Sequence, residues 1–328
     1  MSGRLDREWL SRRSDVVSWV VVTAHLALVF AAVLAAAAIG PSPWLIVAWL
    51  WFGLTFTGPL NLMHECAHRL AFRRRRSSDL LGRWVLGPLS FADFDAYRER
   101  HWAHHRNLGL DGDTKDAYRV DIRGAGLVRL LAGCLSLRDA VRKFTRQAPP
   151  GEELPLGEGV GMGAALLRTA VVQGLLAGSV LAVAWLAHDG AGRILVSAAL
   201  AYGFVYLYGL AALTVFAATL RAVAEHQVGA DGAITEGRAA LRNFPAGPLT
   251  RLVFGSYGFA NHATHHREPG VAHYRLPTVT ASLAVAEPGL IPTRTYLATL
   301  WRLGRPSRPR PLPASPLSEP LGRGRAGR

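Results

Sequence analysis

Four long apolar stretches dominate the pattern of hydrophobic and polar positions along this chain of 328 residues. Each stretch holds roughly 20 residues or more with hardly any charge, which is the length that an α-helix needs to cross the hydrocarbon core of a bilayer. Short polar turns separate the first stretch from the second and the third from the fourth. The pattern therefore predicts two helical hairpins in a membrane, with spans at residues 16–39, 44–63, 162–187 and 194–220.

The N-terminus also fits a second interpretation, a secretory signal peptide, because several arginines precede the first apolar stretch. That stretch is too long for the apolar region of a typical signal peptide. In addition, the second stretch follows after only residues 40–43. Both observations favour a membrane helix that remains in the mature protein.

The distribution of basic residues predicts the orientation of the spans. Arginines crowd the N-terminal tail, the stretch that follows the second span and the C-terminus, whereas the short loops 40–43 and 188–193 contain a single arginine. Because positively charged loops stay in the cytoplasm, we expect both termini and the long central loop to be cytoplasmic. This orientation accounts for much of the formal net charge of +14, so we expect no nucleic acid partner.

Composition divides the chain into three parts. Residues 1–15 form a polar lead-in on the cytoplasmic side, and residues 16–300 contain all the apolar stretches and form one expected membrane domain. Residues 301–328 are rich in proline and arginine, a composition that cannot bury a core and predicts disorder. The two cysteines, Cys66 and Cys134, have no CxxC spacing and indicate neither a zinc finger nor a redox pair.

Eight of the twelve histidines lie in three clusters, one with the spacing HxxxH and two with the spacing HxxHH. Histidines at positions i, i+3 and i+4 share one face of a helix. Imidazole is a preferred ligand of iron, copper, zinc and nickel. All three clusters fall on the predicted cytoplasmic side, so the sequence predicts that they converge on one metal centre. The clusters consist of His64 and His68, then His101, His104 and His105, then His262, His265 and His266.

The number of histidines favours a centre with two metal ions. A single zinc ion takes about four ligands, so eight imidazoles are too many for it. An alternative is the zinc metalloprotease pattern HExxH, which His64, Glu65 and His68 satisfy. That alternative leaves six clustered histidines without a role. A metal carrier is a further possibility, but it requires ligands along a membrane path, and only His25 lies inside a span.

With these three boxes and the surrounding hairpins, the chain resembles the integral-membrane fatty-acid desaturase and hydroxylase superfamily over residues 44–277. The resemblance implies an all-α membrane bundle of about four transmembrane helices, with a cytoplasmic helical cap that holds two non-haem iron ions. It also implies O2 as co-substrate, a long-chain acyl lipid as substrate, and a separate electron donor, either a ferredoxin or a cytochrome-b5-like protein, with its reductase. Desaturation is the expected reaction. Hydroxylation and alkene-forming decarboxylation stay open, since Glu65 stands where many relatives carry aspartate.

The resemblance adds His226 as a ninth ligand, because the family commonly supplies one from the segment after the last span. Metal-bound imidazoles usually donate their second N–H group to a nearby acceptor. Aspartates such as Asp93, Asp95 and Asp113 are candidate partners of this kind, whereas His25 and His188 are expected to have no metal role. Further candidates around the ligands are Asn61, Glu65, Glu99, Glu225, Asn261 and His273.

Overall fold

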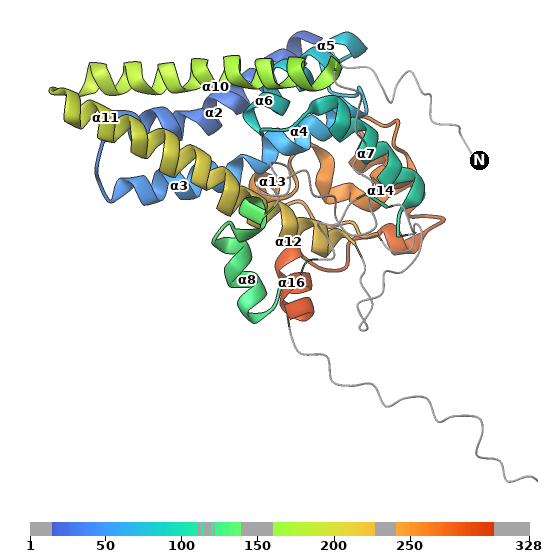
Figure 1. Ribbon diagram of the computed structural model, residues 1–328. Helices are drawn as coiled ribbons and strands as arrows, with labels where there is room; N and C mark the ends of the chain where they lie inside the picture. The colour runs from blue at the N-terminus through green and yellow to red at the C-terminus, as the bar shows by residue number, and fades with distance from the viewer. Residues whose placement is uncertain are drawn as a thin grey trace, which may run out of the picture.

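The computed structural model describes residues 15–109, 113–114, 120, 122–138, 160–226 and 241–304. The predicted lead-in and C-terminal tail lie almost entirely outside these residues. Within the described ranges every regular element is a helix, and four helical segments are long and apolar enough to cross a membrane (Figure 1). The predicted all-α bundle of about four transmembrane helices is therefore confirmed.

The first hairpin consists of α2 (Asp15–Ile39) followed by α3 (Trp44–Thr55) and α4 (Thr57–Ala67). Gly40 makes the turn after α2 in the left-handed region, with φ of 70°, where glycine meets no Cβ clash. Phe56 joins α3 to α4 with helical backbone angles, so the two helices form one span. This span ends at Ala67, beyond the predicted residue 63, so His64 lies inside the helix and His68 at its C-cap.

The second hairpin consists of α10 (Val160–Ala187) and a continuous helical segment of 35 residues, Ala191–Glu225. That segment contains α11 (Ala191–Ala199), two π-helical stretches, η3 (Leu200–Tyr208) and η4 (Leu210–Thr214), and α12 (Val215–Glu225). It extends past the predicted residue 220, which carries Glu225 to the end of the helix and His226 to its C-cap. The two hairpins pack around a buried apolar core that includes Val29, Val33, Phe52, Phe56 and Tyr206.

The part of the chain that connects the two hairpins contains a shorter helical segment, which packs against the bundle. It consists of α5 (Arg75–Leu81), η1 (Gly82–Leu86) and α6 (Gly87–Leu89), and it contacts α4 and α10. The carbonyl groups at its C-terminal end need donors, because Pro88 and Leu89 are buried and water does not reach them. The side-chain amide of Gln173 donates to the carbonyl of Pro88, and the hydroxyl of Tyr206 donates to that of Leu89.

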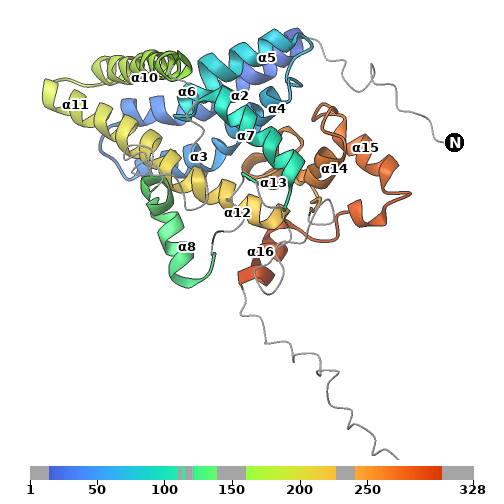
Figure 2. The same cartoon turned by 45° about the vertical axis from the view of Figure 1, so that its right-hand side comes forward.

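Most of the remaining helices gather at one end of the bundle, where the histidine clusters lie, whereas one of them, Gly124–Leu131, lies away from that end against η4 and α12 (Figures 1 and 2). The longest of them is α7 (Phe94–Asn107), which carries the second cluster. The carboxylate of Asp93 caps α7 by accepting hydrogen bonds from the backbone N–H groups of Asp95 and Ala96. The others are α8 (Gly124–Leu131), α13 (Pro248–Val253), η6 (Ser256–Asn261), α14 (His262–Arg267), α15 (Leu276–Leu283), η7 (Pro288–Leu290) and α16 (Tyr296–Gly304).

Candidate metal centre

One group of ring nitrogens comes from all three histidine clusters. It contains one potential ligand atom from each of five residues, all within 4.8 Å of one another: His64, His68, His101, His105 and His265. The Nε2 atom of His68 lies 2.7 Å from Nε2 of His101 and 3.2 Å from Nε2 of His265. The elements α4, α7 and α14 thus bring residues that are nearly 200 positions apart to a single point.

The other four predicted ligands form a second group beside the first. Ring nitrogens of His104, His226 and His266 lie within 4.8 Å of one another, and His262 joins His226 and the carboxylate of Glu225 within the same distance. The rings of His105 and His266 stack with their centroids 4.1 Å apart, which connects the two groups. The nine predicted histidines therefore gather in two adjoining groups of five and four.

Helix geometry explains how each HxxHH cluster is divided. Residues at i and i+4 differ by about 40° around a helix, and those at i and i+3 by about 60° in the opposite direction. In α7, His101 and His105 accordingly enter the first group, and His104 enters the second. In α14, His262 and His266 enter the second group while His265 enters the first. Each cluster therefore contributes to both groups.

Burial favours the neutral imidazole, the form that binds metal ions, at His68 and His266. Desolvation lowers the pKa of His68 to about 3. Desolvation, together with nearby imidazoles such as those of His262 and His105, lowers the pKa of His266 well below its ordinary value. A neutral imidazole keeps a lone pair on one ring nitrogen, and metal binding needs that lone pair.

In the described part of the chain, two of the clustered histidines also have buried ring nitrogens without a hydrogen-bond partner, as expected where a metal ion would bind. Among the described residues, the Nε2 atoms of His64 and His266 are buried and form no hydrogen bond. Leaving a buried polar atom without a partner is costly, so such atoms are normally bound to something. A metal ion bound at each group would satisfy them. The set of nine imidazoles therefore fits two ions of a metal that accepts nitrogen ligands.

Three of the histidines in the second group have hydrogen-bond acceptors or a carboxylate beside their Nδ1 atoms. Nδ1 of His104 lies 2.7 Å from a carboxylate oxygen of Asp113, and both side chains are buried. Nδ1 of His226 donates to the backbone carbonyl of Ala222 over 2.7 Å. Nδ1 of His262 lies 3.7 Å from the carboxylate of Glu225. A proton on Nδ1 leaves the lone pair on Nε2, so the hydrogen bonds of His104 and His226 favour the tautomer that binds metal through Nε2.

Glu65 has a different set of neighbours. One carboxylate oxygen lies 3.6 Å from Nδ1 of His64, and the other accepts hydrogen bonds from the backbone N–H and the ring of His273, each over 3.3 Å. Glu65 therefore lies next to His64 of the first group, and His273 is bound to Glu65. The metalloprotease alternative needs only His64 and His68 with Glu65 as base. The structure, however, collects three further histidines around the same point: His101, His105 and His265.

The remaining candidates hold the surrounding helices or lie at the surface. Asn61 donates to the carbonyl groups of Phe254 and Ser256, which ties α4 to the segment that leads into the third cluster. Asn261 accepts a hydrogen bond from the hydroxyl of Thr280. Asp95 pairs with an arginine of η1 instead of a histidine, and Glu99 is exposed on α7.

The histidines expected to have no metal role contact other parts of the bundle. Nδ1 of His25 forms a 2.9 Å hydrogen bond with the hydroxyl of Tyr257. Nε2 of His188 donates to the carbonyl of Ala37 and so connects the two hairpins at their turns. Neither residue belongs to the two groups of ring nitrogens.

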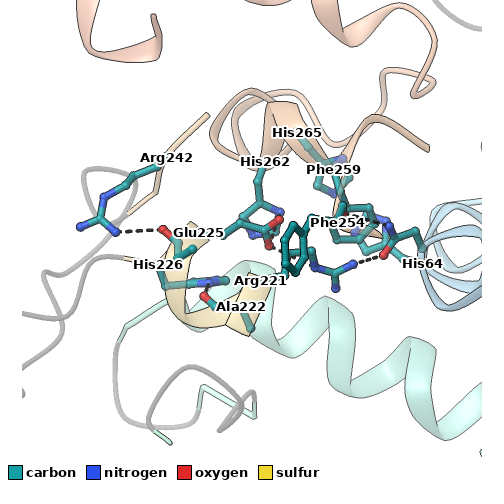
Figure 3. Close-up of polar contacts among 12 residues, drawn as sticks. His64, Arg221, Ala222, Glu225, His226, Arg242, Phe254, Phe259, His262 and His265 are labelled. Carbon is teal, nitrogen blue, oxygen red and sulfur yellow. Dashed lines mark hydrogen bonds and ion pairs between the residues drawn. The ribbon is translucent and has the colours of Figure 1, made fainter. Parts of the chain in front are cut away.

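The sequence interpretation missed two residues between the groups, Arg221 and Phe259 (Figure 3). The ring of Phe259 contacts the rings of both His64 and His262, with centroid distances of 4.6 and 5.8 Å. Arg221 is 8% exposed and lies in the last two turns of the fourth helical segment, just beyond the predicted end of the span. In the sequence it looks like an ordinary arginine at the end of a span, so no local signal distinguishes it.

Fold and site together define a helical membrane protein with a cluster of histidines at one end of its bundle that could hold metal ions. The family model for fatty acid desaturases matches residues 41–296. The chain belongs to this fatty acid desaturase family.

Individual relatives match over shorter segments. An sn-1 oleoyl-lipid 12-desaturase of Anabaena variabilis is 34% identical over 76 residues, which are 22% of this chain and 21% of the relative. A chloroplastic omega-6 fatty acid desaturase of Glycine max is 31% identical over 74 residues, 22% of this chain and 17% of the relative. A beta-carotene 4-ketolase of Protosiphon botryoides is 27% identical over 78 residues, 24% of this chain and 20% of the relative. Each match thus spans about a fifth of the relative.

Proposed function

We propose that this protein is an O2-dependent oxidoreductase that introduces a double bond into the acyl chain of a membrane lipid. The observation that carries the proposal is the gathering of nine buried or half-buried histidines in two adjoining groups, in a chain of the fatty acid desaturase family. We assign two iron ions to these groups. When bound, such ions supply the O2 activation that removal of hydrogen from an unactivated carbon requires.

The chain's own residues would hold and orient the two ions. Five imidazoles would bind one ion and four would bind the other, with Asp113 and the carbonyl of Ala222 fixing the rings of His104 and His226. The buried position of both groups excludes bulk water from the reacting atoms.

The electron balance of the reaction requires a donor. One O2 molecule accepts two electrons and two protons from the adjacent CH2 groups that become CH=CH, and two further electrons and two protons reduce it to two water molecules. We assign the further electrons to a ferredoxin or a cytochrome-b5-like protein with its reductase. Hydroxylation and alkene-forming decarboxylation use the same metal site and are alternative outcomes of the test below.

We assign an acyl lipid as substrate because two of the three relatives described above are named for acyl desaturation. The relative named as a beta-carotene ketolase shows that the match extends to a protein that acts on another apolar lipid. Analysis of both lipid classes therefore belongs in the experiment.

The experiment compares membranes with the active protein and membranes with a His105→Ala variant, each supplied with O2, a ferredoxin, its reductase and NADPH. Mass spectrometry of the extracted lipids should show acyl products lighter by two hydrogen atoms only with the active protein. Products heavier by one oxygen atom would replace desaturation with hydroxylation. Oxidised carotenoids without oxidised acyl chains would overturn the substrate assignment.

We also propose that both termini and the metal centre lie in the cytoplasm. The support is the excess of arginines after α4, in contrast to the turns at residues 40–43 and 188–193. Cysteine labelling tests the orientation with single cysteines placed at Ser77 and at Ser42. A membrane-impermeant reagent added to intact cells should label the cysteine at position 42 alone. Labelling at position 77 would reverse the assignment.

A further inference from the structure

Arg221 is a buried cation in helix α12, one turn before Glu225. A guanidinium group stays charged in proteins, and a buried charge is expensive unless other groups compensate it. Figure 3 shows Arg221 between the residues of the two histidine groups, with His226 and His262 on one side and His64 on the other. The contacts of this side chain therefore bear on how the two groups are held.

The guanidinium group of Arg221 contacts three different ligand-bearing parts of the chain. Its NH1 atom donates a hydrogen bond to the side-chain oxygen of Asn61 in α4. Its central carbon lies over the ring of Phe259 in η6, 4.0 Å from the centroid. Its Nε atom lies 3.6 Å from the carboxylate of Glu225 in α12.

Each of these partners stands close to a predicted metal ligand. Asn61 is one helical turn before His64. Phe259 is three residues before His262, and its ring touches the rings of both His262 and His64. Glu225 directly precedes His226, and its carboxylate lies 3.7 Å from Nδ1 of His262. One side chain thus reaches a neighbour of His64 in the first group and of His226 and His262 in the second.

The partners of Arg221 are themselves held in place. The amide group of Asn61 donates to the carbonyl of Ser256 over 3.1 Å and to its hydroxyl over 2.9 Å. The buried hydroxyl of Tyr296 donates to the carboxylate of Glu225 over 2.9 Å. Because these contacts fix both partners, the planar guanidinium group has little freedom to move, and its position determines the spacing of the elements around it.

We propose that Arg221 is a positioning residue that sets the placement of His64 relative to His226 and His262, and so the separation of the two metal ions. This inference rests on the proposed function, in which the histidine groups bind two ions. A guanidinium group offers donors in a fixed plane and stacks on aromatic rings, whereas the ammonium group of lysine does neither. A positive charge alone is therefore not sufficient to hold these histidines in place, and Arg221→Lys should bind metal little better than Arg221→Met.

The test uses purified full-length protein in which Co²⁺ replaces the native metal, because the visible absorption of Co²⁺ reports on its coordination. Arg221→Met and Arg221→Lys are compared with wild type by cobalt titration, absorption and circular dichroism. The matched control is Arg242→Met. Arg242 is also half-buried beside α12, but its guanidinium donates to the backbone carbonyl of Ala224.

We expect wild type and Arg242→Met to bind two Co²⁺ ions with the same spectrum. Arg221→Met should keep its helical circular dichroism, bind at least one ion about 10-fold to 100-fold more weakly and show an altered spectrum, the range seen when groups that orient ligands are removed. Arg221→Lys should show the same direction of change. A purely structural role would lower the melting temperature of the folded variant without changing the cobalt spectrum.

Two results separate the possible failures. Wild type that binds fewer than two Co²⁺ ions refutes the proposed two-metal centre itself. Wild type that binds two ions, together with an Arg221→Met variant of unchanged affinity and spectrum, refutes only the role of Arg221. Should Arg221→Met not fold, an Arg221→Lys variant with wild-type affinity and spectrum overturns the inference equally.

Discussion

Replacement of Asp113 by asparagine should weaken metal binding without unfolding the protein. The two carboxylate oxygens of Asp113 accept from different donors, Oδ1 from Nδ1 of His104 over 2.7 Å and Oδ2 from the backbone N–H of Gly109 over 3.0 Å. An asparagine side chain has only one oxygen, so its amide group must face one of these two donors. Either Nδ1 of His104 or the backbone N–H of Gly109 then loses its acceptor.

The size of the effect follows from the burial of this contact. The side chains of His104 and Asp113 are 1% and 0% exposed, so water cannot take the place of the lost acceptor. Loss of one buried hydrogen bond costs about 1–3 kcal/mol. Changes to groups that orient metal ligands typically reduce affinity about 10-fold to 100-fold, which is about 1.4–2.7 kcal/mol at 25 °C. The cost of the lost hydrogen bond thus matches a loss of metal affinity of about 10-fold to 100-fold.

The assay is a competition between the protein and a chelator for Co²⁺, followed by absorption, with iron per chain measured on protein purified from cells. Asp93→Asn is the matched control. It makes the same chemical change at the start of α7, where asparagine caps a helix as well as aspartate does. We expect unchanged affinity in the control. An Asp113→Asn variant that binds both ions as tightly as wild type would refute the assignment of Asp113 to His104.

Three further predictions concern other parts of the centre and the bundle. His226→Ala should lose one of two bound metal ions and nearly all activity, whereas His188→Ala should keep both; full metal content in His226→Ala would remove this residue from the ligands. Glu65→Gln should retain both ions by elemental analysis, because it orients neighbours of His64 and binds no metal itself; loss of the metal would contradict this. Tyr206→Phe should lower the melting temperature in detergent by several degrees, since an unsatisfied buried carbonyl at Leu89 costs about 1–3 kcal/mol; an unchanged melting temperature would show that the hydroxyl contributes little.

The sequence alone determined the architecture of the bundle and the identity of the histidines that gather at its end. Spans can be predicted because lipid accepts only helices whose backbone groups are paired internally, so apolar length is a local and strong signal. The observed ends differ from the predicted ones mainly at α4 and α12, where polar residues such as His64 and Glu225 continue the helix beyond the apolar stretch.

The tertiary structure decided how the histidines are shared between the two groups. Within each HxxHH cluster, helix geometry separates the histidine at i+3 from those at i and i+4, but it does not say that His104 turns towards His226 while His101 and His105 turn towards His68. The partners of each histidine depend on how α7 and α14 are set against α4 and α12. Contacts between residues far apart in the chain fix this arrangement, and no local pattern records them.

Dependence on long-range contacts also explains which of the residues around the histidines could be predicted from the sequence. Asp113 and Glu225 were among several acidic candidates, and only the folded chain shows that Asp113 reaches His104 while Glu99 faces outward. Arg221 resembles any arginine near the end of a span until Asn61 and Phe259 are placed beside it. The sequence determines which side chains are available as metal ligands, because side-chain chemistry is local. The geometry that orients those ligands comes from long-range packing, which only the tertiary structure provides.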